Sequence, residues 1–196
     1  LLESKGHQFR TNSDTEVIVH LYEEFGLGFV DHLRGMFAIA IWDGPKKKSV
    51  LARDRLGLKP LYYRTAEGTL QFGSELKTIL ACPDVPRTIS DAALREFLVF
   101  QYVPNPMTIL EGIKQLEPGH LLVWEDGKAS VHEYWRLTME PTPQPFDQAA
   151  TRFDELLTES VKLRLISDVP LGVFLSGGLD SGSVVATMSR LSEEPV

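Results

Sequence analysis

The spacing of hydrophobic residues near the start of the chain is helical. Apolar residues at positions 17, 18, 21, 22 and 25 recur with a period of about 3.6, and Gly26 is a natural stop signal. Ser13 and Glu16 have the S-x-x-E spacing of a capping box, which predicts that the helix starts here.

Short apolar runs separated by turn residues then predict three β-hairpins. The hairpins join residues 36–42 to 49–53, 60–64 to 69–72, and 120–124 to 129–135. The first run, 36–42, is apolar throughout, so we expect a strand that is covered on both faces.

Two short helices are predicted between the second and third hairpins. Ser74 would cap a helix over residues 74–80, and Ser90 would cap one over residues 90–100. The second helix is expected to turn Leu94, Phe97 and Leu98 inward. Residues 1–138 are therefore predicted to form a sheet-rich α+β domain.

The composition changes at residues 139–145, where three prolines fall at alternate positions. We expect a semi-rigid linker here, because proline lacks the N–H group that regular structure needs. From residue 146 a long helix to about residue 167 leads into an apolar run at 171–175, expected to be a buried strand. A second helix follows, so residues 146–196 are predicted to begin an α/β domain with a parallel sheet.

A polar turn with two glycines links this strand to the second helix. Gly177 and Gly178 allow close approach of a ligand to the backbone, and the helix beginning near Asp180 directs free N–H groups into the turn. Such a turn binds phosphate, although the GxxxxGK[ST] pattern is missing. The alternative is a strand–turn–helix unit with a purely structural role. The order of residues 176–181 instead resembles the pyrophosphate-binding loop of enzymes that adenylate a substrate with ATP.

Composition excludes several classes of function. The chain carries a net charge of −7 and no basic run beyond residues 46–48, so neither nucleic acid nor an anionic membrane is an expected partner. It has no apolar stretch long enough to span a bilayer and no signal peptide, which predicts a cytoplasmic protein. The single Cys82 excludes an internal disulfide framework, and the histidines show no pairing at ligand spacing, so no zinc site is expected.

Residues 53–63 carry more charge than a hairpin connection requires. From the residues alone we expect a structural turn in which Asp54 accepts hydrogen bonds, Gly57 adopts an unusual dihedral angle and Pro60 sets the direction of the next strand.

A series of motifs along the chain resembles the glutamine-hydrolysing asparagine synthetases. The motifs are SDTE at 13–16, GMFA at 35–38, RDRLGLKPLY at 53–62, GSE at 73–75, LEPGH at 116–120, DVP at 168–170 and SGGLDS at 176–181. The resemblance implies an N-terminal-nucleophile glutaminase domain, here a partial sandwich over residues 1–138. It also implies the start of an ATP-pyrophosphatase-type synthetase domain over residues 146–196.

The resemblance also implies roles for individual residues. Asp14 would bind the α-amino group of glutamine, whereas the residues alone suggest an acid that stabilises the helix start. Met36 would line a tunnel for ammonia, whereas the residues alone suggest a buried strand residue. Asp180 would help to hold Mg²⁺. The ATP-binding residues would be Leu175, Ser176, Gly177, Gly178, Leu179, Asp180 and Ser181.

The family's nucleophile is an N-terminal cysteine, and no residue of this chain corresponds to it, so we expect the chain as given to be inactive. The complete enzyme would use ATP, aspartate and glutamine to make asparagine. Two alternatives stay open: a sister amidotransferase that amidates another carboxylate, and an inactive truncated chain. The acceptor and the oligomeric state, a homodimer included, are also left open.

Overall fold

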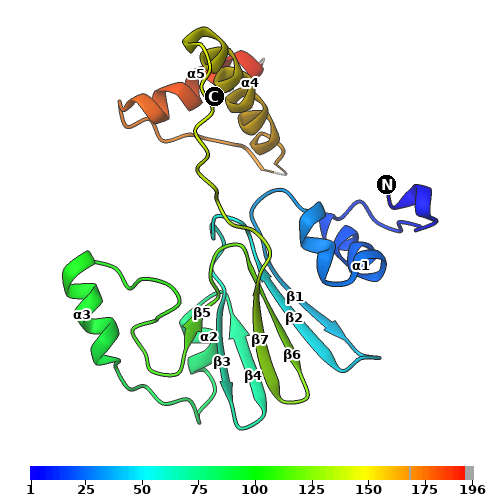
Figure 1. Ribbon diagram of the computed structural model, residues 1–196, viewed down its shortest axis with the longest axis vertical. Helices are drawn as coiled ribbons and strands as arrows, with labels where there is room; N and C mark the ends of the chain where they lie inside the picture. The colour runs from blue at the N-terminus through cyan, green and yellow to red at the C-terminus, as the bar shows by residue number, and fades with distance from the viewer. Residues whose placement is uncertain (168, 193–196) are drawn as a thin grey trace. The chain divides into compact units, whose positions relative to one another are not determined.

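The structure, a computed structural model, describes residues 1–167 and 169–192 and divides into two compact units, Leu1–Thr138 and Met139–Val196. In the described part of the chain, all strands belong to unit 1, and unit 2 contains the helices α4 (Phe146–Arg164) and α5 (Leu179–Leu191) (Figure 1). Asp168, part of one motif named above, lies outside the described residues.

Unit 1 contains two antiparallel sheets, and the three predicted hairpins are confirmed. The first sheet has the order β1-β2-β6-β7 and the second β4-β3-β5. The strands are β1 (Ala38–Asp43), β2 (Lys48–Arg53), β3 (Tyr62–Ala66), β4 (Thr69–Gly73), β5 (Lys114–Gln115), β6 (His120–Glu125) and β7 (Lys128–Glu133).

The alternation of side chains along β2 and β6 divides unit 1 into layers. Val50 pairs with Val123, and both pack on one face of the first sheet with residues of α1 (Asp14–Phe25) and of the 3₁₀ helix η2 (Gly26–His32). Leu51 pairs with Leu122, and both face the opposite way, into a cluster with Tyr63 of the second sheet. Successive residues of a strand point to opposite faces, so the first sheet is covered on one face by helices and on the other by the second sheet.

A further cluster covers the other face of the second sheet. Ile79 of α2 (Leu76–Leu80) is fully buried together with Ile113, and Tyr62, the neighbour of Tyr63 in β3, packs against them. Unit 1 is therefore a stack of helix, sheet, sheet and helix.

The start of α1 agrees with the prediction, but its capping box does not. Ser13 is the N-cap, and its hydroxyl accepts a hydrogen bond from the N–H of Thr15. The Glu16 carboxylate accepts from the N–H groups of Arg10 and Thr11 at 2.8 Å instead of bonding back to Ser13. The capping box is wrong because the preceding loop folds over the helix and offers Glu16 closer donors.

Three other expectations about unit 1 are also wrong. Strand β1 is an edge strand with Trp42 64% exposed, so it is not covered on both faces. The helix α2 begins after Glu75 and has no side-chain cap from Ser74. The helix α3 (Asp91–Phe100) is capped by Ser90 as predicted, but it lies away from both sheets in Figure 1 and buries only Ala93. The side chains expected to point inward, Leu94, Phe97 and Leu98, are 39%, 45% and 73% exposed.

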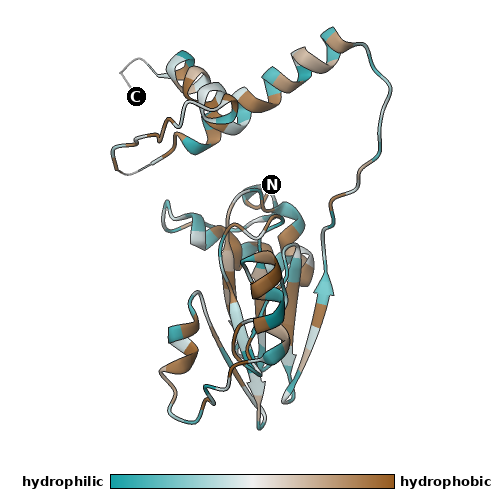
Figure 2. Cartoon of the chain, turned by 90° about the vertical axis from the view of Figure 1, so that its left-hand side faces the viewer, coloured by the Kyte–Doolittle hydropathy of each residue, from teal (hydrophilic) through white to brown (hydrophobic). Residues whose placement is uncertain are grey.

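In unit 2 the long helix is present, and Figure 2 shows both hydrophobic and hydrophilic residues along α4. The apolar run at 171–175 is not a strand, and Phe174 is almost fully exposed. A strand needs a hydrogen-bonded neighbour, and no other strand occurs among the described residues of unit 2. Hydrophobicity without a pairing partner therefore leaves this run irregular.

The expected turn at the end of β2 is confirmed. Asp54 is 1% exposed, and its carboxylate accepts hydrogen bonds from four backbone N–H groups, those of Phe37, Leu56, Leu58 and Lys59. The guanidinium of Arg53, 4% exposed, donates to the carbonyls of Gly57, Lys59 and Leu116. Gly57 has a φ of 67°, and a Cβ there would lie 2.7 Å from Pro118, so no larger residue fits.

Replacing Asp54 by alanine should destabilise unit 1 strongly. The change leaves four N–H groups without their acceptor and the buried Arg53 without its neighbouring negative charge, a loss of roughly 3–5 kcal/mol. Urea unfolding followed by tryptophan fluorescence measures this, because all three tryptophans lie in unit 1. The exposed Asp84→Ala is the control and should stay within about 0.5 kcal/mol of the parent. Equal stabilities of the two variants would contradict this account of the turn.

Tyr134 should make the protein sensitive to alkali. Burial, helped by the nearby charge of Asp54, raises the pKa of Tyr134 to about 12, and its hydroxyl donates to the Arg53 carbonyl. The unfolded chain releases this proton near pH 10, so stability should fall as the pH rises from about 10 towards 12. Tyr134→Phe should make the fall shallower in urea unfolding measured across that range, whereas the exposed Tyr102→Phe should follow the parent. An unchanged slope for Tyr134→Phe would refute the prediction.

Candidate functional site

The glycine turn of unit 2 has the backbone geometry of an anion-binding loop. Gly177 has a φ of 77°, a conformation that other residues rarely adopt, and Gly178 is the N-cap of α5. The first hydrogen bond within the helix runs from the N–H of Gly182 to the carbonyl of Gly178 at 3.0 Å. The N–H groups of residues 179–181 thus precede the helical ladder and are free to meet a ligand.

Two serine hydroxyls hold this turn together. Ser176 Oγ and Ser181 Oγ are 2.9 Å apart, and the Ser181 hydroxyl also donates to the carbonyl of Gly178 at 3.3 Å. The N–H of Gly178 points at Ser176 Oγ from 3.4 Å. The serines therefore link the two ends of the turn, while residues 175–180 remain exposed.

The position of Asp180 gives the turn a second chemical capability. It lies in the first turn of α5, exposed to solvent, beside the positive end of the helix dipole. A carboxylate in that place can carry a hard cation such as Mg²⁺ next to phosphate oxygens. The structure thus brings together the predicted residues 175–181, although the strand expected to lead into them is not formed.

In unit 1, Asp14 is the first residue of α1 and is exposed. Its carboxylate accepts a hydrogen bond from the hydroxyl of Thr15 at 3.3 Å. The loop before it is tied to the helix through Glu16: the hydroxyl of Thr11 and the N–H of Arg10 lower the pKa of Glu16 to about 2. A fixed helix start therefore presents the Asp14 carboxylate to solvent.

Met36 lies in the segment before β1 and is 47% exposed, so the expectation of a buried strand residue is wrong. A groove of about 770 Å³ nearby runs between α1 and β1, with Thr15, Tyr22 and Trp42 in its walls. In the part of the chain that the structure describes, the residues that line this groove do not include Asp14 or Met36.

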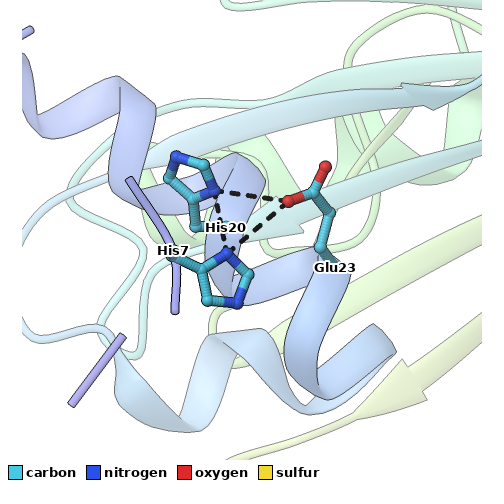
Figure 3. A group of neighbouring side chains, drawn as sticks. All are labelled: His7, His20 and Glu23. Atoms are coloured by element: carbon cyan, nitrogen blue, oxygen red, sulfur yellow. Dashed lines mark hydrogen bonds and ion pairs between the residues drawn. The ribbon is translucent and has the colours of Figure 1, made fainter. Parts of the chain in front are cut away.

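The structure also brings together two histidines that show no pairing at ligand spacing in the sequence. Figure 3 shows His7, from the segment before α1, beside His20 and Glu23 of α1. The two Nδ1 atoms are 3.1 Å apart. Spacing alone missed the cluster because His7 reaches it through the fold. The one local signal was the pair His20 and Glu23, which stand one helical turn apart on the same face.

No helix in the part of the chain that the structure describes combines the length and hydrophobicity needed to cross a bilayer.

Two family models match the chain. The model described as a glutamine amidotransferase domain matches residues 1–135, and the asparagine synthase model matches residues 152–196. A Bacillus subtilis protein named glutamine-hydrolyzing asparagine synthetase 3 is 40% identical over 186 residues, which cover 94% of this chain and 30% of that protein. A Gibberella zeae protein named as an amidase is 35% identical over 199 residues, covering 95% of this chain and 28% of that protein.

Among solved structures, the glutamine phosphoribosylpyrophosphate amidotransferase of B. subtilis aligns with 68% of this chain and 25% of that one. The TM-score is 0.44 and the sequence identity 23%. The chain spans about a third or less of the length of the two curated relatives above. With residues 1–135 matched, it is a member of the glutamine amidotransferase domain family.

Proposed function

We propose that the chain is part of a glutamine-dependent asparagine synthetase. Residues 1–138 would belong to its glutaminase domain, residues 139–145 would be a linker, and residues 146–196 would begin its ATP-binding domain. The order of the two family matches, at 1–135 and 152–196, carries this proposal. The anion-binding geometry at residues 175–181 supports it from the structure.

In the proposed reaction, glutamine is hydrolysed to glutamate and ammonia. A carboxylate oxygen of the aspartate side chain attacks the α-phosphate of ATP, and pyrophosphate leaves. Ammonia then attacks the acyl carbon of the aspartyl-adenylate, AMP leaves, and asparagine forms. Adenylation makes AMP the leaving group that ammonia displaces. The loop therefore needs only to hold and orient the nucleotide.

The geometry of the loop fits this task. The free N–H groups at the start of α5 would hold the β- and γ-phosphates, and the hydroxyls of Ser176 and Ser181 would bind further oxygens. The backbone of Leu175 would complete the contact. Asp180 would help to hold Mg²⁺, which would offset the charge of the phosphates.

The glutaminase role of unit 1 assigns a partner to Asp14. Its carboxylate would bind the α-ammonium group of glutamine, and Met36 would line the route of ammonia towards the second site. The stacked layers of helix, sheet, sheet and helix support an N-terminal-nucleophile type of domain. In this proposal, the residues of unit 1 bind and position glutamine.

The similarity to the amidase favours a second candidate function. A sister amidotransferase could use the same glutamine and nucleotide sites and transfer ammonia to a carboxylate other than that of aspartate. Both candidates need Asp14 and Asp180, so the acceptor alone distinguishes them. Product analysis with aspartate as the only carboxylate supplied therefore separates the two.

Substitutions at Asp180 and Asp14 should affect different nitrogen donors in the native protein. Asp180→Asn keeps the size of the side chain but removes the charge that would hold Mg²⁺. Amide formation should collapse with glutamine and with free ammonia alike, while glutamine hydrolysis should largely survive. Asp147→Asn, in the first turn of α4, is the matched control and should behave as the parent.

Asp14→Ala should impair only the use of glutamine. Loss of a charge-assisted bond of roughly 1.5–3 kcal/mol lowers kcat/KM for glutamine about ten- to hundredfold, whereas synthesis from added ammonia should be nearly unchanged. Asp91→Ala is the control, because Asp91 also follows a capping serine as the first residue of a helix. Steady-state assays with each nitrogen donor make the comparison.

Full ammonia-dependent synthesis by Asp180→Asn would overturn the nucleotide role of the loop.

A further inference from the structure

We propose that His7, His20 and Glu23 form a binding site for a divalent transition-metal ion, for which zinc is the best fit. The proposal is independent of the activity proposed above. It rests on the convergence of one atom from each of these side chains (Figure 3). It also rests on the carboxylates that lie next to the opposite nitrogen of each imidazole ring.

The distances between the three ligand atoms match a tetrahedral metal site. His7 Nδ1 and His20 Nδ1 are 3.1 Å apart, His20 Nδ1 and Glu23 Oε2 are 3.3 Å apart, and His7 Nδ1 and Glu23 Oε2 are 3.8 Å apart. The point in the plane of the three atoms that is equidistant from them lies about 2.0 Å from each, so an ion about 0.6 Å above that plane would have the bond lengths of about 2.1 Å that are typical of tetrahedral zinc.

Hydrogen bonds satisfy this convergence less well than a cation would. Only one proton fits between the two Nδ1 atoms, because two N–H groups directed at each other would repel. A proton on His20 Nδ1 must be shared between His7 Nδ1 and the Glu23 oxygen, which weakens both bonds. A proton on His7 Nδ1 leaves the Glu23 oxygen facing His20 Nδ1 without one. A cation satisfies all three atoms at once.

The opposite nitrogen of each ring is next to a carboxylate. His7 Nε2 lies 3.3 Å from Glu24 Oε2, and His20 Nε2 lies 3.8 Å from Glu16 Oε1. These carboxylates favour the ring proton on Nε2 and leave the Nδ1 lone pair for a metal. Histidine ligands of metals are commonly supported in this way by a carboxylate on the far nitrogen.

The two supporting carboxylates are themselves held. Glu16 accepts from the N–H groups of Arg10 and Thr11, and Glu24 forms an ion pair with Lys5. Held carboxylates keep the rings oriented, which lowers the entropy lost when the metal binds.

The surroundings determine the kind of ion and its role. Two imidazoles and one carboxylate suit zinc, whereas magnesium and calcium prefer oxygen ligands alone. The side chains of His7 and His20 are only 16% and 18% exposed, but that of Glu23 is 58% exposed, which leaves one side open to a water ligand. The ion would join the segment before α1 to the helix itself. It would thus fix the loop that leads to Asp14.

Direct metal binding to the native protein tests the proposal. The protein is treated with a chelator, dialysed and titrated with Co²⁺, a spectroscopic substitute for zinc, and separately with Zn²⁺. We expect one ion per chain, the strong visible absorption of tetrahedral Co²⁺, its loss on addition of Zn²⁺, and a Tm that rises with Zn²⁺ concentration. Absence of stoichiometric binding would overturn the proposal.

Variants locate the ion. His20→Gln and Glu23→Gln should abolish the Co²⁺ absorption, and Glu24→Gln should weaken Zn²⁺ binding about 10- to 100-fold. His132→Gln and Glu111→Gln, on exposed positions outside the cluster, are the matched controls and should bind as the parent does. Because Glu23 is largely exposed, its variant remains informative even if His20→Gln does not fold. Unchanged binding by Glu23→Gln would place the ion elsewhere and refute the site.

Discussion

Two buried charged residues at the end of β2 hold unit 1 together. The chain leaves the first sheet at Arg53 and reaches the second sheet at Tyr62 through a loop whose backbone groups bond to the buried side chains of Arg53 and Asp54. Asp54 satisfies the N–H groups of this loop and Arg53 its carbonyls. Burying two charges costs several kcal/mol unless hydrogen bonds replace the lost water. The two charges can therefore be buried only as part of a complete network.

This network also fixes the helical layer that carries α1. The N–H of Phe37 bonds to the Asp54 carboxylate, and the Tyr134 hydroxyl bonds to the Arg53 carbonyl, so the ends of β1, β2 and β7 meet there. With the strands in register, Val50 and Val123 lie together on the face that α1 covers. The positions of Asp14 and of His20 and Glu23 on α1 thus depend on a loop at the end of β2.

The parts of the fold that sequence predicted are those decided by neighbouring residues. Short apolar runs and turn residues were enough to predict three hairpins, and Asp54 with Gly57 was enough to predict the turn after β2. Predictions that depended on distant partners did not succeed. The inward face of α3, the covered faces of β1 and the strand at 171–175 each required a packing or pairing partner that hydrophobicity alone does not identify. His7 likewise met His20 only through the tertiary fold.

The loop at residues 176–181 shows that the geometry of a turn can be more local than the strand next to it. Its hydrogen bonds connect Ser176, Gly178 and Ser181, which are at most five positions apart, and Gly177 needs no neighbour to adopt a positive φ. The turn therefore forms although residues 171–175 are unpaired. The same physical reason makes its sequence a useful indicator, because the side-chain hydrogen bonds of Ser176 and Ser181 that shape the turn lie within the motif. A cluster assembled from separate segments, such as that of His7 and His20, has no such signature.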